Sequence, residues 1–452
     1  MSVTETLASF VVESRPQDIP TLTYDEARRA LVNYMGCAIG GAKEPALENA
    51  LAVLLPFTGK ATAQVLGRSE TCDPLYASLF NGIGSHVHEY DDTLPKNYIH
   101  PSIPVASALF AYASANRGTA QAVSGQEFLQ AFILGFDIES RIGNAVYPSH
   151  YEAGWHITST TGVFGAAAAI GKLLKLDTQQ MIWAFGLAAT QAAGIREMFG
   201  SMAKSFQPGR AAQNGYTAAL LAQNNFTAGE QVLEGPRGFA AVTALEYDLD
   251  KAIDQLGKHF ELHDNAYKPY ACGLVVHPTI DACSQIREAH NIDPLTIEKI
   301  EVRVAPLVLD LCNKKDLQRA LQSKYSIYHA AAIGLARGKG GLREFTDEAI
   351  ADPVLSNLRS RTHAVADDRI TEDQADVTVE LKSGEPIHFF LEASLGNIER
   401  PLSNVQLDEK FIDQATLVLA QAQVEELLAA TWAIGSCDDV GSIVSLAVHK
   451  EK

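Results

Sequence analysis

The sequence predicts a mainly α-helical protein made of a large all-helical domain and a smaller α+β domain. Two observations carry this prediction. Apolar residues recur at helical spacing along most of residues 22–260. Strand-like alternation of apolar and polar residues begins after about residue 265. We therefore expect a helical domain over residues 1–265, with residues 403–452 packing back on it, and an α+β domain over residues 266–402.

The helical segments of the first domain follow one another with short Gly, Pro or Asp breaks. We expect helices over residues 24–39, 104–115, 125–146, 161–176, 180–194 and 211–223. Thr23 is the expected N-cap of the first, and Thr160 or Thr161 that of the fourth. Several segments are rich in Ala and Gly, and small residues let helices approach closely. The sequence therefore predicts a tight helical bundle.

The second domain combines strands with helices. Residues 297–305 alternate apolar and polar side chains like a half-buried strand. Residues 376–381 and 387–391 do the same on either side of residues 382–385, which predicts a hairpin. Between these strands we expect helices over residues 327–336 and 354–360, and beyond them a helical tail from Leu407 onward.

The composition is that of a globular protein and argues against several partners. Of the 452 residues, 47% are hydrophobic and 20% charged, which is enough to bury a large core. The net charge of −18 argues against nucleic acid or anionic lipid, although local positive charge could still hold a small anion. We expect no membrane span and no signal peptide. Six scattered cysteines without a CxxC pair indicate a reduced, cytoplasmic chain.

Residues 85–102 (SHVHEYDDTLPKNYIHPS) gather three histidines, three carboxylates, a threonine and a lysine between two apolar helices. On a helix, the workable pairs are His88 with Asp92, and Glu89 with Asp92 or Thr93. These pairs are too few for a convincing metal site. One interpretation is an acid/base site of carboxylates and a histidine. The other is a loop whose acidic residues and threonine satisfy helix ends.

His156 follows Gly154 and Trp155 and precedes a long apolar helix. A histidine just before a helix N-terminus lies where the helix dipole favours an anion and lowers the histidine pKa. This position suits an acid/base group next to an anionic substrate. The alternative is a histidine packed in a turn.

Lys204 and Arg210 are the only charged residues between positions 198 and 229 of a strongly acidic chain. Cations among glycines and alanines need an anionic partner if they are buried. Substrate carboxylates are one such partner, and an arginine can clamp a carboxylate with two hydrogen bonds. The alternative is an internal ion pair with the acidic residues at positions 89, 91 and 92.

Residues 267–273 (YKPYACG) and His277 fall at the expected boundary between the two domains, where ligand sites are common. Lys268 would add a positive group there, or it is a surface lysine in a proline-containing turn. No sequence feature lowers the pKa of Cys272, so we interpret it as a packing residue. Glycine-rich phosphate loops and a GxSxG motif are absent.

Taken together, five motifs resemble the MmgE/PrpD family, in the family's order and across most of residues 5–405. The motifs are HEYDDT…HPS (88–102), GWHITSTTGVFGAAAAIGKLL (154–174), FGSMAKSFQPGRAAQNG (199–215), KPYACGLVVHPTIDA (268–282) and KYSIYHAAAIGLARG (324–338). The resemblance implies the MmgE/PrpD fold, with a lid-like α+β domain, a homodimer, and no metal or organic cofactor. Known members are 2-methylcitrate dehydratases, cis-aconitate decarboxylases and an iminodisuccinate epimerase. The second and third motifs are more similar to the decarboxylase and epimerase branch.

Carried over by position, the resemblance implies a site in which a histidine moves a proton and lysines hold carboxylates. The expected catalytic residues are His100, His156, Thr93, Glu89 and Asp92. The expected substrate-binding residues are Lys204, Lys268, Arg210, His277, Tyr328 and His329. Three positions depart from the decarboxylases: His100 lies one residue further from Thr93, Glu89 stands where relatives often have Asp, and His329 replaces a tyrosine.

The expected function is a cofactor-free lyase that acts on a small di- or tricarboxylate and resembles cis-aconitate decarboxylase. Because of the three departures, a 2-methylcitrate or alkylcitrate dehydratase and an epimerase of an iminodisuccinate-like acid remain alternatives. Two further classes stay open: a non-catalytic binding protein on the same fold, and a metal-dependent hydratase or hydrolase.

Overall fold

The computed structural model describes residues 1–384 and 386–449, and its internal contacts divide the chain into two units. The first unit comprises Met1–Val87, Asp91–Asn265 and the chain from Asn404 onward. The second comprises His88–Tyr90 and Ala266–Ser403. The prediction of a mainly helical chain with a smaller α+β part is confirmed.

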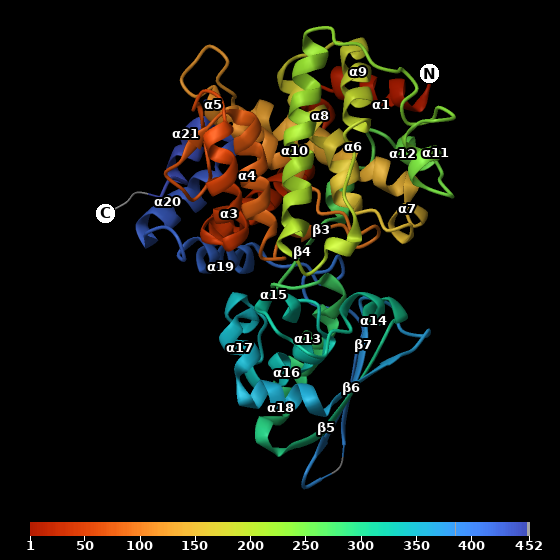
Figure 1. The fold of residues 1–452 in the computed structure, drawn as a ribbon, viewed down its shortest axis with the longest axis vertical. Coiled ribbons are helices and arrows are strands. Elements are labelled where there is room, and N and C mark those ends of the chain that lie inside the picture. The colour runs from red at the N-terminus through yellow and green to blue at the C-terminus, as the bar shows by residue number, and fades with distance from the viewer. Residues whose placement is uncertain (385, 450–452) are drawn as a thin grey trace. The chain divides into compact units, whose positions relative to one another are not determined.

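The first unit is a bundle of helices with a few two-residue strands (Figure 1). Its longer helices are α1 (Val3–Glu13), α2 (Thr21–Gly40), α3 (Pro45–Leu54), α4 (Pro74–His86), α5 (Ser102–Ala115), α6 (Gly125–Val146), α8 (Ile157–Leu173), α9 (Thr178–Ala189), α10 (Met202–Gln223), α19 (Asn404–Ala415) and α20 (Gln421–Trp432). Shorter helices are α7 (Ser149–Glu152), α11 (Phe239–Thr243), α12 (Asp250–Ile253) and α21 (Gly441–Leu446). The strands are β1 (Ala63–Gln64), β2 (Thr71–Cys72) and β3 (Asp92–Thr93).

Helices α4, α5, α6, α8 and α10 pack against one another in the middle of this unit (Figure 1). Glycines allow the close approach that the sequence predicts. A Cβ on Gly135 of α6 would lie 2.7 Å from the carbonyl oxygen of Gly165 on α8. A Cβ on Gly215 of α10 would lie 2.5 Å from the carbonyl oxygen of Val163 on α8. A side chain at either position would push the helices apart. Because both positions are glycines, α6 and α10 can each pack closely against α8.

Of the six helices expected within residues 24–223, three begin three residues or more before the expected position. Helix α2 begins at Thr21, so Thr23 lies inside it and its hydroxyl contacts His263 Nε2 at 2.9 Å instead of capping the helix. Helix α8 begins at Ile157, and Thr160 and Thr161 bond back to the Ile157 carbonyl. Helix α10 begins at Met202 rather than residue 211, because packing against α4 and α8 holds a helix that contains Pro208.

The second unit is a four-stranded sheet with helices on one side. Its strands in spatial order are β6 (Thr362–Ala366), β5 (Ile297–Val304), β7 (Ala375–Leu381) and β8 (Ile387–Leu391); the short strand β4 (Ala266–Tyr267) precedes them. Its helices are α13 (His277–His290), α14 (Pro306–Cys312), α15 (Ala320–Ser323), α16 (Ile327–Arg337), α17 (Asp347–Ala351) and α18 (Pro353–Arg361).

The expected hairpin is present, since β7 and β8 pair antiparallel with Val377 opposite Phe389. One residue of its turn, Glu385, lies outside the described residues. The sequence did not predict β6, which pairs in parallel with β5 and needs the whole helical connection from α14 to α18 to return. Ile300, Val302 and Val377 are fully buried on the face that the helices cover.

Among the described helices, none is both long enough and apolar enough to cross a bilayer.

Candidate active site

Helix α4 ends at His86, and the acidic segment that follows it is not helical. Asp73 caps the helix by accepting hydrogen bonds from the amides of Leu75 and Tyr76. His86 is fully buried at its C-terminal end. Glu89 has a left-handed backbone with φ of 55°, which turns the chain away from the helix axis. The chain from Glu89 onward therefore does not continue the helix on which pairs among His88, Glu89, Asp92 and Thr93 were expected.

Asp91 lies between two histidines of the first unit. Its Oδ1 is 3.1 Å from His86 Nδ1, and its Oδ2 is 2.8 Å from His100 Nδ1. The two rings are 4.8 Å apart between centroids. Asp91 is 1% exposed, and His86 and His100 are also buried. A buried carboxylate in this position orients both imidazoles.

The surroundings of His100 fix which of its nitrogens carries a proton. Besides Asp91, its Nδ1 lies 2.9 Å from the backbone oxygen of Asp92 and 2.9 Å from Thr93 Oγ1. A backbone carbonyl can only accept, so Nδ1 is the donor and the basic atom of neutral His100 is Nε2. The His100 amide donates to Thr158 Oγ1 at 3.0 Å, which ties the segment to α8.

His156, and not Thr160 or Thr161, is the N-cap residue of α8, and it lies at the helix start as expected. Its ring stacks on His86 with centroids 6.1 Å apart and meets the edge of Phe199 at 5.4 Å. Three histidine rings therefore lie together at the positive end of a 17-residue helix. That end of a helix favours a bound anion.

Lys204 and Arg210 both lie on α10 but have different surroundings. Lys204 is 4% exposed, and its Nζ lies 5.1 Å from the centre of the Phe199 ring that also touches His156. Arg210 is exposed and donates to Gln213 Oε1 at 2.5 Å. The structure therefore places Lys204 beside the histidines and Arg210 at the surface.

Two further carboxyl groups, those of Asp92 and Glu139, are buried in the first unit. Asp92 is fully buried, and its Oδ2 accepts hydrogen bonds from Ser102 Oγ and, at 2.8 Å, from Asn265 Nδ2. Burial raises the pKa of Asp92 to about 6, against the effect of these hydrogen bonds. Glu139 of α6 is also fully buried, and burial together with the charge of Asp92 raises its pKa well above the ordinary value.

A second cluster surrounds Glu89 within the second unit. Lys268 is 1% exposed, and its Nζ lies 4.0 Å from Glu89 Oε2 and donates to the Glu89 backbone oxygen at 3.4 Å. Tyr325 donates its hydroxyl to Glu89 Oε1 at 2.7 Å, and Lys324 donates to the backbone oxygen of His88. Lys268 is therefore a buried cation, not the surface lysine that was its alternative. Burial raises the pKa of Cys272, which fits its interpretation as a packing residue.

Three other expected substrate-binding residues lie elsewhere in the second unit. His277 is buried at the start of α13, with its ring against the edge of Tyr270 at 5.3 Å. Tyr328 is half-buried and donates to Asn313 Oδ1 at 2.7 Å. His329 is buried, with Nε2 2.8 Å from the Glu344 oxygen and Nδ1 3.2 Å from Arg359. Internal groups therefore engage both ring nitrogens of His329, and its expected substrate contact stays a prediction.

Sequence reasoning missed His86 and Asp91 in the first cluster and Lys324 and Tyr325 in the second. Asp91 and Asp92 are adjacent and chemically identical, so only the fold decides which of them meets the histidines. Lys324 and Tyr325 lie immediately before α16, within the motif that supplied Tyr328 and His329. The motif at residues 324–338 therefore predicted the segment that lies at the second cluster, but not which of its residues contact Glu89.

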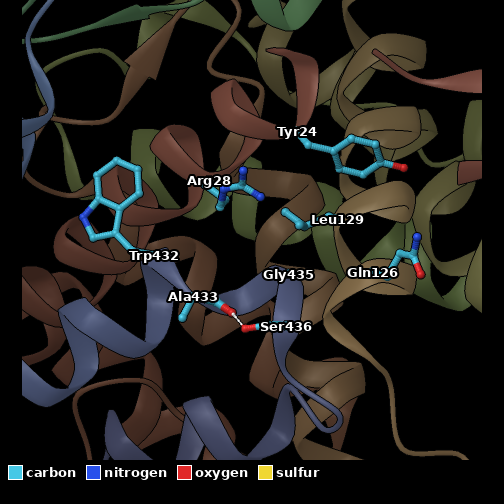
Figure 2. Close-up of a pocket in the computed structure, with 8 residues that line it drawn as sticks. All are labelled: Tyr24, Arg28, Gln126, Leu129, Trp432, Ala433, Gly435 and Ser436. Atoms are coloured by element: carbon cyan, nitrogen blue, oxygen red, sulfur yellow. Dashed lines mark hydrogen bonds between the residues drawn. The ribbon is translucent and has the colours of Figure 1, made fainter. Parts of the chain in front are cut away.

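A pocket of about 400 Å³ on the first unit is separate from both clusters (Figure 2). It lies at the start of α2 and α6 and at the end of α20, where the short 3-10 helix η9 (Ile434–Ser436) follows. Tyr24, Arg28, Gln126, Leu129, Trp432, Ala433, Gly435 and Ser436 line it. Arg28 forms an ion pair with Asp25 on its own helix, and no expected site residue lines the pocket.

Comparison with known proteins matches both parts of the chain. The MmgE/PrpD N-terminal domain matches residues 5–251, and the MmgE/PrpD C-terminal domain matches residues 270–434. A cis-aconitate decarboxylase of Aspergillus terreus is 25% identical, covering 98% of this chain and 95% of its own. The human cis-aconitate decarboxylase is 24% identical over 98% of this chain and 94% of its own. A 2-methylcitrate dehydratase of Cupriavidus necator is 24% identical over 91% and 89%.

Proposed function

Because this chain belongs to the MmgE/PrpD family, we propose that it is a lyase that acts on a small di- or tricarboxylate, with cis-aconitate as the first candidate substrate. Relatives named cis-aconitate decarboxylase match the chain over 98% of its length. The observation that carries the proposal is the Asp91–His100 pair, 2.8 Å apart in the same buried cluster as His156. This arrangement supplies a histidine held in one tautomer for proton transfer.

In the proposed decarboxylation, the bond between a carboxylate and its neighbouring carbon breaks and CO2 leaves. The electron pair of that bond stays on the substrate and is delocalised toward a conjugated carboxylate. His100, protonated on both nitrogens, donates its Nε2 proton to the substrate carbon and becomes neutral. Asp91 stabilises the imidazolium before this transfer, and His156 orients the substrate or acts as a second acid/base. One proton is consumed for each CO2 released.

The lysines provide the positive charge that a polycarboxylate requires. Lys204 lies beside the histidines of the first unit and is proposed to hold a carboxylate that gains charge in the transition state. Lys268 of the second unit, next to Glu89, is likewise proposed as a substrate-binding residue. Thr93, Glu89 and Asp92 are proposed to support these groups through the hydrogen bonds described above. Arg210 is given no role in this proposal because it is exposed.

Dehydration of a 2-methylcitrate-like acid is the second candidate, because 2-methylcitrate dehydratases also match the chain. Here a base removes a proton next to a carboxylate and an acid protonates the departing hydroxyl, so water leaves instead of CO2. The same histidine cluster and lysines would serve, since charge again builds next to a carboxylate.

The deciding experiment is NMR of the purified protein in D2O with cis-aconitate and, separately, with 2-methylcitrate and longer alkylcitrates. Decarboxylation gives a dicarboxylate with one deuterium at the protonated carbon, and dehydration gives an alkene without loss of CO2. Deuterium incorporation without a net product identifies an epimerase. If no substrate reacts or exchanges, and each still binds, the chain is a binding protein and the proposal is overturned.

We also propose a homodimer in the cytoplasm, as the family resemblance and the scattered cysteines led us to expect. Light scattering after size exclusion tests the first point: a mass near twice 48.7 kDa supports the dimer and a mass near 48.7 kDa contradicts it. Fractionation of the source cells tests the second.

A further inference from the structure

Glu139 is a fully buried carboxyl group to which the proposed reaction gives no role. It lies on α6 and faces α8 at two glycines, Gly162 and Gly165, where an added Cβ would come within 3.1 Å of its Oε1 and 2.9 Å of its Oε2. Neither carboxyl oxygen has a hydrogen-bond partner among the described residues. A buried polar group in this state is costly and therefore needs a reason.

The groups around Glu139 favour its protonated form. Asp92 is the charged residue whose field reaches it, and that charge adds to burial in raising the pKa of Glu139. On its own helix, Asp137 and Arg141 are paired with each other at 2.6 Å. From α8, the residues that face it are glycines. Because the charge of Asp92 acts on Glu139 in a buried region, the two carboxyl groups cannot both ionise cheaply, so this pair retains a proton.

Asp92 connects this pair to the proton-transfer group. Its backbone oxygen accepts the hydrogen bond from His100 Nδ1 at 2.9 Å. Its side chain is held by Ser102 and Asn265. A second negative charge on Glu139 would repel the Asp92 carboxylate and strain these contacts. The position of Asp92, and with it the orientation of His100, therefore depends on the charge of Glu139.

We propose that Glu139 is a positioning residue that stays protonated during turnover and thereby keeps Asp92 seated against His100. The inference rests on the proposed function for its kinetic consequence, but the protonation of Glu139 is independent of which substrate the protein uses. Glu139 does not touch the substrate in this proposal. Its contribution is to leave one negative charge, not two, on the pair formed by Asp92 and Glu139.

The test compares the wild type with Glu139→Gln, which is neutral at every pH and nearly the same shape. Glu127→Gln is the matched control: the same change on the same helix, at its exposed first turn. We expect the infrared spectrum of the wild type at pH 7 to contain a protonated-carboxyl band that Glu139→Gln lacks and Glu127→Gln retains. This readout needs no substrate, so it remains decisive even if no polycarboxylate is turned over.

The kinetic readout is the pH profile of kcat with the substrate identified by NMR. For the wild type and Glu127→Gln, we expect kcat to fall about tenfold over the alkaline pH range in which the infrared band disappears. For Glu139→Gln, we expect no such fall in kcat over that range. Absence of the band from the wild type at pH 7, or its survival in Glu139→Gln, overturns the proposal. If the band is assigned to Glu139 but all three proteins share one pH profile, the residue only fills space and the positioning role is wrong.

Discussion

At the scale of single residues, Asp91 decides how the two histidines beside it can act. Because the Asp91 carboxylate lies 2.8 Å from His100 Nδ1, the basic nitrogen Nε2 faces away from it, and its negative charge balances the positive charge of a protonated His100. Asp91→Asn removes the negative charge that balances a protonated His100, while the backbone oxygen of Asp92 still accepts from Nδ1. We expect kcat to fall about 10²-fold or more with little change in KM. Steady-state kinetics measure this, with the exposed Asp25→Asn as control. A kcat within threefold of wild type would show that Asp91 does not orient the proton donor.

Lys204 is the second residue with a sharp expected effect. Its buried ammonium is proposed to bind a carboxylate more strongly as charge builds in the transition state. Lys204→Ala should therefore raise KM about tenfold and lower kcat about 10²-fold. The exposed Lys258→Ala is the matched control. Arg210→Ala should have a much smaller effect than Lys204→Ala, and equal effects would contradict the different roles we give the two cations.

The sequence pointed to most of these residues but not to their partners. It identified His100, His156 and Lys204, and the structure places them among buried side chains of one unit. It could not separate Asp91 from Asp92, because residue type and spacing are the same for both. It allowed helical pairs in the segment after His86 or, as an alternative, a loop; the left-handed backbone at Glu89 rules out a continuous helix there.

At the scale of elements, the contact between α6 and α8 is the most sensitive part of the first unit. A Cβ on Gly165 would lie 2.8 Å from the Gly135 oxygen and 2.8 Å from the Glu139 Cβ. We expect Gly165→Ala to destabilise the unit by about 1–3 kcal/mol, since overpacking must move one helix. All three tryptophans, 155, 183 and 432, belong to this unit, so their fluorescence during urea unfolding reports it. Gly229→Ala, where a Cβ meets nothing within 4 Å, is the control. Equal midpoints for the two variants would contradict this account.

The stability of the second unit should depend on pH through His329. Burial lowers the pKa of His329 to about 4, whereas an unfolded histidine titrates near 6.5. Below pH 6.5, His329 binds a proton in the unfolded chain but stays neutral in the folded unit. The free energy of unfolding therefore falls as the pH drops toward 4. Between pH 7 and pH 5 this loss is about 2 kcal/mol. Hydrogen exchange of α16 and α18 measures it, because the second unit contains no tryptophan.

His329→Gln should remove most of this pH dependence, since the glutamine amide can still donate to the Glu344 oxygen but cannot titrate. His363→Gln, an exposed change in the same unit, should leave the dependence unchanged. If protection from exchange still falls equally between pH 7 and pH 5 in His329→Gln, another group controls the acid sensitivity of this unit.

Helices and strands were predicted correctly where apolar residues recur at one regular spacing along a long segment. They were missed where a local feature interrupts that spacing. The bounds of α6 were predicted exactly, because a capping box at Ser124 and Glu127 precedes an uninterrupted apolar pattern. The start of α10 was missed because Pro208 and Gly209 indicate a break in sequence. Strand β6 was missed because it is five residues long with one fully buried side chain, so it carries little alternation.

At the scale of the whole molecule, membership of the family narrows the proposed function to a few reactions. Whether activity requires a metal then distinguishes the proposed cofactor-free lyase from a metal-dependent hydratase or hydrolase. The proposed chemistry needs cations to hold carboxylates and a histidine to move a proton, and the chain supplies both. We therefore expect the protein dialysed against EDTA to keep at least about 90% of its activity, and elemental analysis to find no stoichiometric metal. A non-catalytic protein would bind polycarboxylates without turnover and tolerate His100→Ala. A metal-dependent hydratase would lose activity on dialysis and recover it when one divalent metal is returned. That recovery would contradict the cofactor-free mechanism while leaving the family assignment intact.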